Sequence, residues 1–564
     1  MFSVLLIWCY MLITTFFSGY ALCMLGERVT GYRIRHKISI FFAGIVFATV
    51  YAQIFSLFAK VGLAANVVLL LFCIVTGICF RKKICEELGT LARTRWIVAA
   101  LLMVLMAYGA SRGYIHYDTG LYHAQSIRWI EEYGVVKGLG DLHCRLAYNS
   151  ASFALSALYS MAFLGGRSYH ACAGFLALLV AWECMDVFEC MGAVPGMFRR
   201  GTQSETAGRR FRRADIGRLF AIYYLLIIFD EMVSPASDYF MVLTAFFLVI
   251  RWLELREDLV EEPEPYGMLC VLGVYLLTIK LSAALILLLV LRPAILLIRE
   301  KKWKTIGSFL MGGLVVAVPY FVRNVVISGW LVYPFTSIDL FSVDWKIPKG
   351  LADYDAHEIQ VWGRGYTDVS RYHIPIGEWI GDWFRSQSGL DRVFILGAIA
   401  GCVLLVIGVL LYILVPKLRK DMRYLPEEAV LSACFLFWLL TSPLMRYGCV
   451  YVWLAAGVIW GDMLLVISAK KRQIGILLTA MILLFGGYKG LMFGKEIIVS
   501  YRNENWILQK DYENYPVEEY DLDGVTIYVP VEGDRTGYDA FPSTPDPGDV
   551  GLRGTTLGDG FVIK

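Results

Sequence analysis

An acid and three histidines gather in one polar segment, residues 112–150, directly after an apolar run. Asp118 lies between His116 and His123, and His143 follows in the same segment. A carboxylate at the boundary of lipid and water is partly desolvated, which raises its pKa and suits it to take a proton from a hydroxyl group. Asp118 is therefore a candidate general base. Its place before a helical run also suits an N-cap, which accepts hydrogen bonds from free backbone N–H groups; the two roles are compatible.

The histidines of this segment do not match a metal-binding pattern. The spacing of His116, His123 and His143 matches no metal-ligand pattern on a helical face, and no Cys-x-x-Cys motif occurs. No cofactor is therefore expected, and a divalent metal shared by Asp118 and Asp238 is the less favoured alternative. His123 is expected instead to donate to a phosphate or a sugar hydroxyl.

Five further polar residues stand at the ends of other apolar runs. Asp238 suits either an N-cap or an acid that orients an acceptor. Lys280 separates two apolar runs, where it either snorkels to the surface or offers a point charge to a lipid-linked phosphate. Arg323, with the adjacent Asn324, and Arg446 are candidate phosphate ligands, because a guanidinium donates two parallel hydrogen bonds. The alternative for each arginine is an ordinary anchor at the membrane interface.

The composition predicts that these residues belong to an all-α polytopic membrane protein. Of 564 residues, 58% are hydrophobic and only 18% are charged, whereas a soluble protein has about 25% charged residues. Many apolar runs are long enough to cross a hydrocarbon core of about 30 Å as a helix. The chain has no phosphate-binding Gly-rich loop and no Ser-His-Asp arrangement, and its arginine-rich segment 199–218 lies between two apolar runs. Use of a nucleotide sugar and binding of nucleic acid are therefore not expected.

The placement of basic residues predicts about fourteen membrane spans, since basic loops favour the cytoplasmic side. Both the N-terminus and the C-terminal tail are then expected on the outer side of a cell membrane. The absence of an Asn-x-Ser/Thr glycosylation site favours a bacterial plasma membrane. The predicted spans are 1–25, 38–58, 63–80, 96–110, 169–189, 219–229, 238–253, 266–279, 281–298, 305–322, 393–415, 427–440, 449–467 and 474–491.

Two helices of the first large outer loop are expected to lie on the membrane surface. Residues 121–134 have helical spacing that separates an aromatic face, expected in the lipid, from a polar face. Residues 149–164 would cover only about 24 Å as a helix, too little for a full crossing. In the tail, 494–564, residues 523–531 predict a short strand entered by an Asp-Gly turn. The tail is therefore expected to be a small, loop-rich outer appendage.

Several segments together resemble the GT-C superfamily of membrane glycosyltransferases, which includes protein mannosyltransferases and the aminoarabinose transferases of lipid A. The pattern is an apolar run, an outer loop with an acid and Leu-Tyr-His, and interfacial helices. More narrowly, YDTGLYHAQSIRWIEEYG, SPASDYF, RNVVISGWLVYPF and SPLMRYG resemble a bacterial family of multi-pass proteins built on that plan. The resemblance implies a GT-C-like core over residues 96–493, preceded by a three-span addition, 1–95. Asp118 is followed by Thr119 rather than by the second acid of many such enzymes.

The resemblance implies an inverting glycosyltransferase that takes a sugar from a polyprenyl-phosphate carrier on the outer face of the membrane. Asp118 would activate a hydroxyl of a glycan, lipid or protein acceptor. The expected substrate-binding residues are Tyr122, His123, Asp238, Lys280, Arg323, Asn324 and Arg446. The alternative is a polysaccharide polymerase or a lipid-linked glycan flippase. An outer cavity bounded by Asp118, Asp238 and Arg446 would favour transfer, whereas a central polar passage would favour transport.

Overall fold

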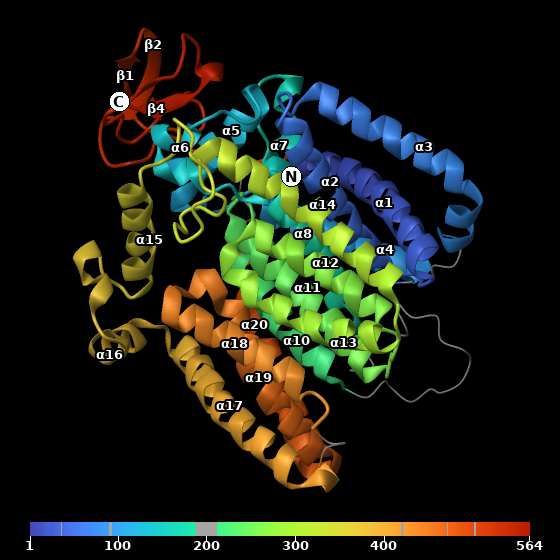
Figure 1. Ribbon diagram of the computed structural model, residues 1–564. Helices are drawn as coiled ribbons and strands as arrows, with labels where there is room; N and C mark the ends of the chain where they lie inside the picture. The colour runs from blue at the N-terminus through green and yellow to red at the C-terminus, as the bar shows by residue number, and fades with distance from the viewer. Residues whose placement is uncertain (35, 89–92, 188–210, 419–421, 471, 501–503) are drawn as a thin grey trace.

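The computed structural model describes the chain except for residues 35, 89–92, 188–210, 419–421, 471 and 501–503, and it is mostly helical (Figure 1). In the described part, eight helices are long and apolar enough to cross a membrane. The protein is therefore membrane-embedded. These helices are Phe2–Thr30, Lys37–Ser56, Leu63–Glu86, Leu281–Arg299, Trp303–Ser328, Gly389–Leu414, Met445–Leu465 and Ile476–Ser500.

The first helices pack into the same core as the later ones. Helix α1 (Phe2–Thr30) crosses α2 (Lys37–Ser56) at Gly19 and Gly44, where an added Cβ would overlap the backbone of the other helix. Small residues let two membrane helices approach this closely. Helices α3 (Leu63–Leu88) and α4 (Arg93–Ala110) flank this pair.

The two helices expected on the membrane surface are enclosed by protein. Every side chain of α7 (Ala151–Tyr159) is buried, and the helix packs against α2 and α5 (Ala124–Glu132). Protein therefore surrounds α7, and the predicted position of 149–164 at the outer membrane surface stays a prediction. Of the aromatic face predicted for 121–134, Trp129 is fully buried against Phe541 and Phe561 of the tail, whereas Tyr133 is exposed.

Four helices form the centre of the molecule: α8 (Cys172–Cys184), α10 (Arg213–Ile227), α11 (Ser237–Glu257) and α12 (Glu264–Ile279). Helix α11 is apolar on nearly all sides and is buried along most of its length, as expected for a helix surrounded by others. The chain then breaks at Lys280, whose backbone is extended. A 3-10 helix (Leu281–Val290), α13 (Leu291–Arg299) and α14 (Trp303–Ser328) follow.

The second half places two short helices beside a group of long ones. Helices α15 (Lys349–Gly363) and α16 (Ile376–Ser386) stand at the side of the molecule (Figure 1). Trp383 of α16 packs edge-on against Trp438, with ring centroids 5.9 Å apart. The long helices are α17 (Gly389–Leu414), α18 (Leu425–Thr441), α19 (Met445–Lys470) and α20 (Arg472–Ser500). Helix α20 continues past residue 494, where the sequence suggested that the tail begins.

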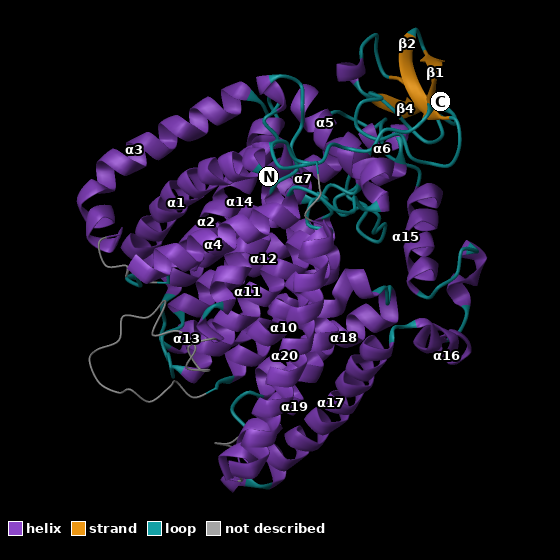
Figure 2. Cartoon of the chain, turned by 180° about the vertical axis from the view of Figure 1, so that it is seen from behind, coloured by secondary structure: helices purple, strands orange, loops and turns teal. Residues whose placement is uncertain are grey.

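The tail contains two small antiparallel hairpins (Figure 2). Strands β1 (Val517–Leu522) and β2 (Val525–Pro530) form the first, and β3 (Val550–Leu552) and β4 (Phe561–Ile563) form the second. Asp523 and Gly524 both have positive φ, as a two-residue type I′ turn requires. The strand and its Asp-Gly turn, predicted for 523–531, are confirmed.

Candidate functional site

A cavity of about 240 Å³ lies where the first large loop meets α11, the break at Lys280 and the start of α19. Five of the eight predicted site residues line it: Asp118, Tyr122, Asp238, Lys280 and Arg446. They come from four separate parts of the chain. The sequence places each of them at the end of an apolar run, and folding brings these ends together.

Asp118 forms an ion pair with Arg446, with Oδ2 and Nη2 3.0 Å apart. His116 also contacts Arg446, and its Nδ1 accepts a hydrogen bond from the backbone N–H of Asp118. Asp118 begins the π-helical turn Thr119–His123 but makes no side-chain capping bond. The carboxylate therefore faces the cavity and its cation rather than the helix end. Burial lowers the pKa of His116 below its usual value, although the neighbouring Asp118 opposes that shift.

Asp238 and Lys280 form the second ion pair of the cavity. Asp238 lies in the first turn of α11 without capping it, and the positive end of the helix dipole favours a carboxylate there. Lys280 reaches the cavity because α12 ends at Ile279, whose carbonyl oxygen accepts a hydrogen bond from Ser150. The Lys280 ammonium lies 3.7 Å from the centre of the Tyr447 ring. The helix break thus gives the lysine a polar environment.

Three predicted site residues lie one layer behind the cavity wall. Arg323 is buried and donates to Oδ1 of Asn149 over 2.9 Å and to the Ser56 hydroxyl. Asn324 is also buried, and its Oδ1 accepts a hydrogen bond from Asn149 over 3.0 Å. Since Asn149 lines the cavity, Arg323 and Asn324 hold the wall in place and do not themselves face the interior.

The third residue behind the wall is His123. Its Nδ1 lies 3.2 Å from the Thr119 hydroxyl, and its ring lies against Tyr122 and Phe153. Burial lowers the pKa of His123 well below its usual value, so the imidazole is neutral at pH 7. His123 supports Tyr122, which does line the cavity.

Aromatic side chains form one wall of the cavity. Tyr148, Tyr333 and Trp362 line the side of the cavity formed by the large loop and α15. Both tyrosine hydroxyls donate to the buried Asp355, over 2.6 and 3.0 Å. Burial raises the pKa of Asp355. Trp362 belongs to a segment rich in tryptophan and tyrosine, residues 330–383, whereas no sequence pattern links Asp355 to Tyr148, more than two hundred residues away.

Arg145 adds a third cation to the cavity lining. Its Nη2 donates to Glu358 over 2.6 Å, and its guanidinium carbon lies 4.6 Å from the centre of the Trp362 ring. The lining thus holds three cations, two carboxylates and several aromatic rings. Such a surface can neutralise an anion at one side and contact an uncharged, partly apolar ring at the other. Among the described residues, no group of three or more acidic, histidine or cysteine side chains is placed to hold a metal.

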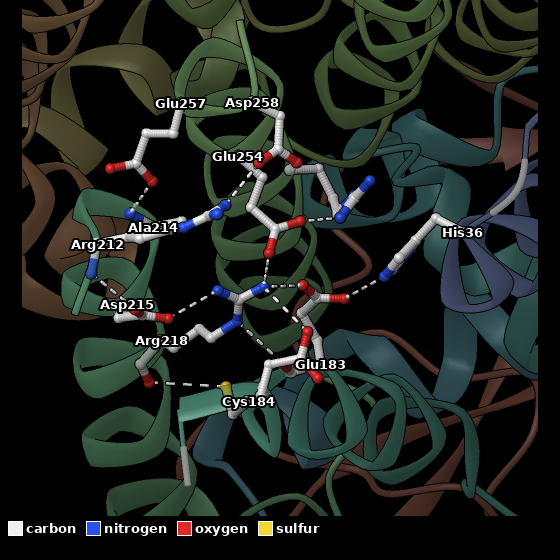
Figure 3. Close-up of polar contacts among 12 residues, drawn as sticks. His36, Glu183, Cys184, Arg212, Ala214, Asp215, Arg218, Glu254, Glu257 and Asp258 are labelled. Carbon is white, nitrogen blue, oxygen red and sulfur yellow. Dashed lines mark hydrogen bonds and ion pairs between the residues drawn. The ribbon is translucent and has the colours of Figure 1, made fainter. Parts of the chain in front are cut away.

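A second ionic cluster is centred on Arg218 (Figure 3). The Arg218 guanidinium of α10 donates to Glu183 over 2.8 Å, to Asp215 over 2.9 Å and to Glu254. His36 lies 3.3 Å from the other oxygen of Glu183. The cluster ties the start of α2 to α8, α10 and α11. None of its residues lines the cavity.

The fold and this cavity define a helical, membrane-embedded protein with a charged and aromatic cavity between loops and helix ends. The chain belongs to the family described as Domain of unknown function (DUF8201), whose model matches residues 1–453. No curated protein and no solved structure matches the chain significantly. Every residue that lines the cavity falls within the matched region, and the tail lies beyond it.

Proposed function

We propose that the protein is an inverting glycosyltransferase of GT-C type, which moves a sugar from a polyprenyl-phosphate carrier to an acceptor hydroxyl. The observation that carries the proposal is the shared cavity: Asp118, Asp238, Lys280 and Arg446 all line it. A carboxylate beside two cations is the arrangement that such a reaction needs. A transporter would instead need a polar passage between the two sides of the membrane.

In the proposed reaction the acceptor oxygen attacks the anomeric carbon while the bond from that carbon to the phosphate oxygen breaks. Asp118 takes the acceptor's proton, and the bonding electrons leave with the phosphate. Lys280 and Arg446 neutralise the charge that develops on the departing phosphate, which lowers the barrier more than ground-state binding does. In the absence of substrate these cations pair with Asp238 and Asp118, so phosphate binding would loosen the Arg446 pair and leave Asp118 available as a base.

The proposal includes the finer membrane topology: about fourteen spans in a bacterial plasma membrane, with the cavity, the N-terminus and the tail outside. Each predicted span overlaps a helix of the structure for most of its length. The N-terminus lies beside the tail, since the N–H groups of Phe2 and Ser3 donate to Trp506 and Ile507, each over 2.9 Å. The tail also contacts the loop that carries Asp118. One side of the membrane for all three is therefore consistent with the contacts.

The test uses purified full-length protein with a panel of polyprenyl-phosphate monosaccharides and an extract of envelope acceptors. The readouts are release of polyprenyl phosphate and sugar transfer. Asp118→Asn should slow both by about 100-fold or more, because a general base is lost. Asp344→Asn is the matched control, since Asp344 also pairs with an arginine, Arg553, at 2.6 Å but lies outside the cavity.

Near wild-type transfer by a folded Asp118→Asn protein would show that Asp118 is not the base. A flippase would instead move the intact lipid-linked sugar across liposome membranes without releasing polyprenyl phosphate, and this outcome would refute the proposal.

A further inference from the structure

The C-terminal tail covers the loop that carries Asp118. In Figure 1 the tail lies against α5 and α6 (Leu139–Leu142), two helices that are far from the tail in sequence. Its side chains and backbone contact both sides of Asp118, at Tyr117 and at Gly120. These contacts come from a part of the chain that the family model does not match.

The backbone contact between the tail and the loop is at Gly120, within the π-helical turn that follows Asp118. A π-helical turn takes an extra residue into the helix; such turns are rare and frequently occur at functional sites. The Gly120 carbonyl accepts hydrogen bonds from the backbone N–H groups of Thr536 and Gly537, over 3.0 and 2.9 Å. A Cβ at Gly120 would lie 2.7 Å from the ring of Tyr515. The tail backbone thus holds the turn, and a side chain at residue 120 would displace the Tyr515 ring.

A second contact holds the residue on the other side of Asp118. The Arg535 guanidinium lies between the rings of Tyr117 and Tyr515, 4.5 Å from the centre of each. The Tyr117 hydroxyl donates to Asp534. An arginine between two aromatic rings is held by cation–π attraction on both faces. Residues 117 and 120 are therefore both anchored to the tail.

The tail is itself fastened to the protein over the next helix. Gln125 donates to the carbonyl groups of Gly537 and Ala540, each over 2.8 Å, and Arg128 donates to Tyr538 over 2.7 Å. The Tyr538 hydroxyl donates to the buried Glu131 over 2.5 Å. Because these contacts are buried or partly buried, the tail position is well defined.

We propose that the tail, through residues 515 and 534–537, is the positioning element of the site: it holds the π-helical turn that sets Asp118 in the cavity. Arg535 is a positioning residue, since it contacts neither the cavity nor its ions. The inference rests on the proposed function only for the role of Asp118. The contact between the tail and the π-helical turn is a structural property, and hydrogen exchange measures it independently of activity.

The first experiment measures hydrogen exchange in the full-length protein with Arg535→Ala. Exchange should rise by about tenfold at the amides of Thr536, Gly537 and residues 118–124, because local opening becomes easier. Arg553→Ala is the matched control, since Arg553 is a tail arginine that lies 4.9 Å from the centre of the Trp345 ring and contacts no part of the Asp118 loop. It should leave those amides unchanged.

A second pair of variants tests the same contact from the loop side. Gly120→Ala raises intrinsic helix propensity, so any loosening of the turn must come from its overlap with Tyr515. In a Tyr515→Ala background the same Gly120→Ala change should no longer speed exchange at Thr536 and Gly537, because the ring that it would overlap is gone. Unchanged exchange in Arg535→Ala and in Gly120→Ala, with both proteins folded, would overturn the inference.

Transfer kinetics separate this inference from the proposed function. Arg535→Ala should lower kcat and leave KM for the donor unchanged, because the phosphate contacts at Lys280 and Arg446 are intact. If the wild-type protein shows no transfer at all, the proposed function fails, but the exchange results still decide whether the tail holds the loop.

Discussion

Two ionic clusters built from the same residue types differ in their exposure to solvent. Around Arg218, the side chains of Arg218, Glu183 and Asp215 are fully buried. In the cavity, the Asp118 and Arg446 side chains retain 20% and 32% of their exposure. In the buried cluster Arg218 forms ion pairs with four carboxylates and joins α10 to α8 and α11. In the cavity each acid pairs with one cation, and the space beside them is open.

The difference separates structural charges from charges that are available to a ligand. A buried arginine that is surrounded by acids cannot exchange partners without leaving several charges unpaired in a medium of low dielectric constant, which is costly. A partly exposed pair beside a cavity can exchange at little cost, because water or a ligand replaces the lost contact. The Arg218 cluster therefore holds the helices together, and the cavity pairs are suited to binding.

The largest expected effect on stability comes from a change in the buried Arg218 cluster. Arg218→Met should destabilise the protein by about 3–5 kcal/mol, because it leaves several buried carboxylates without their shared cation. Thermal unfolding in detergent measures the change. Arg446→Met is the matched control and should cost far less, since Asp118 keeps access to solvent. Equal stability losses in the two variants would remove the distinction between the clusters.

A smaller effect on stability, with a clear effect on binding, is expected at Lys280. Lys280→Met should weaken binding of polyprenyl phosphate by about tenfold to a hundredfold, the value of a charge-assisted hydrogen bond. Lys280→Arg keeps the charge and should retain most of the affinity. Fluorescence titration with polyprenyl phosphate in nanodiscs measures both. Unaltered affinity in Lys280→Met would exclude this lysine from the phosphate site.

The smallest expected effect is a pH dependence near the cavity. Burial lowers the pKa of His143 to about 3, whereas the unfolded chain binds that proton near the ordinary value of about 6.5. Below pH 6.5 the unfolded state therefore takes up a proton that the folded state does not, and stability falls as the pH drops toward the folded pKa. His143→Gln should flatten the fall in melting temperature between pH 7 and pH 5. The exposed His373, changed to Gln, should leave it as in the wild type.

The sequence predicted the helices and several of the cavity residues for physical reasons that act locally. Apolar runs identify buried helices, and a charged residue at the end of such a run, as at Asp118, Asp238 and Arg446, must find water or a partner. Lys280 followed the same rule, because its position between two apolar runs marked the helix break. These features depend on a short window of sequence and could be read from it.

The rest depends on contacts between distant segments. The burial of α7 could not be read from its length, because only packing against α2 and α5 shows that protein rather than lipid surrounds it. Arg323 carries the same signal as Arg446, yet the structure places it behind Asn149. The contact between Gly120 and the tail joins residues about four hundred positions apart. Contacts between such distant residues cannot be predicted from composition or from local residue spacing.

A cryo-EM structure of the protein with a bound polyprenyl-phosphate sugar tests the proposed reaction most directly. We expect the phosphate to lie within hydrogen-bond distance of Lys280 and Arg446, Arg446 to have moved from Asp118, and Asp118 to face the anomeric carbon. The Arg218 cluster should be unchanged. A lipid phosphate bound away from the cavity, with the Asp118–Arg446 pair intact, would contradict the proposed reaction.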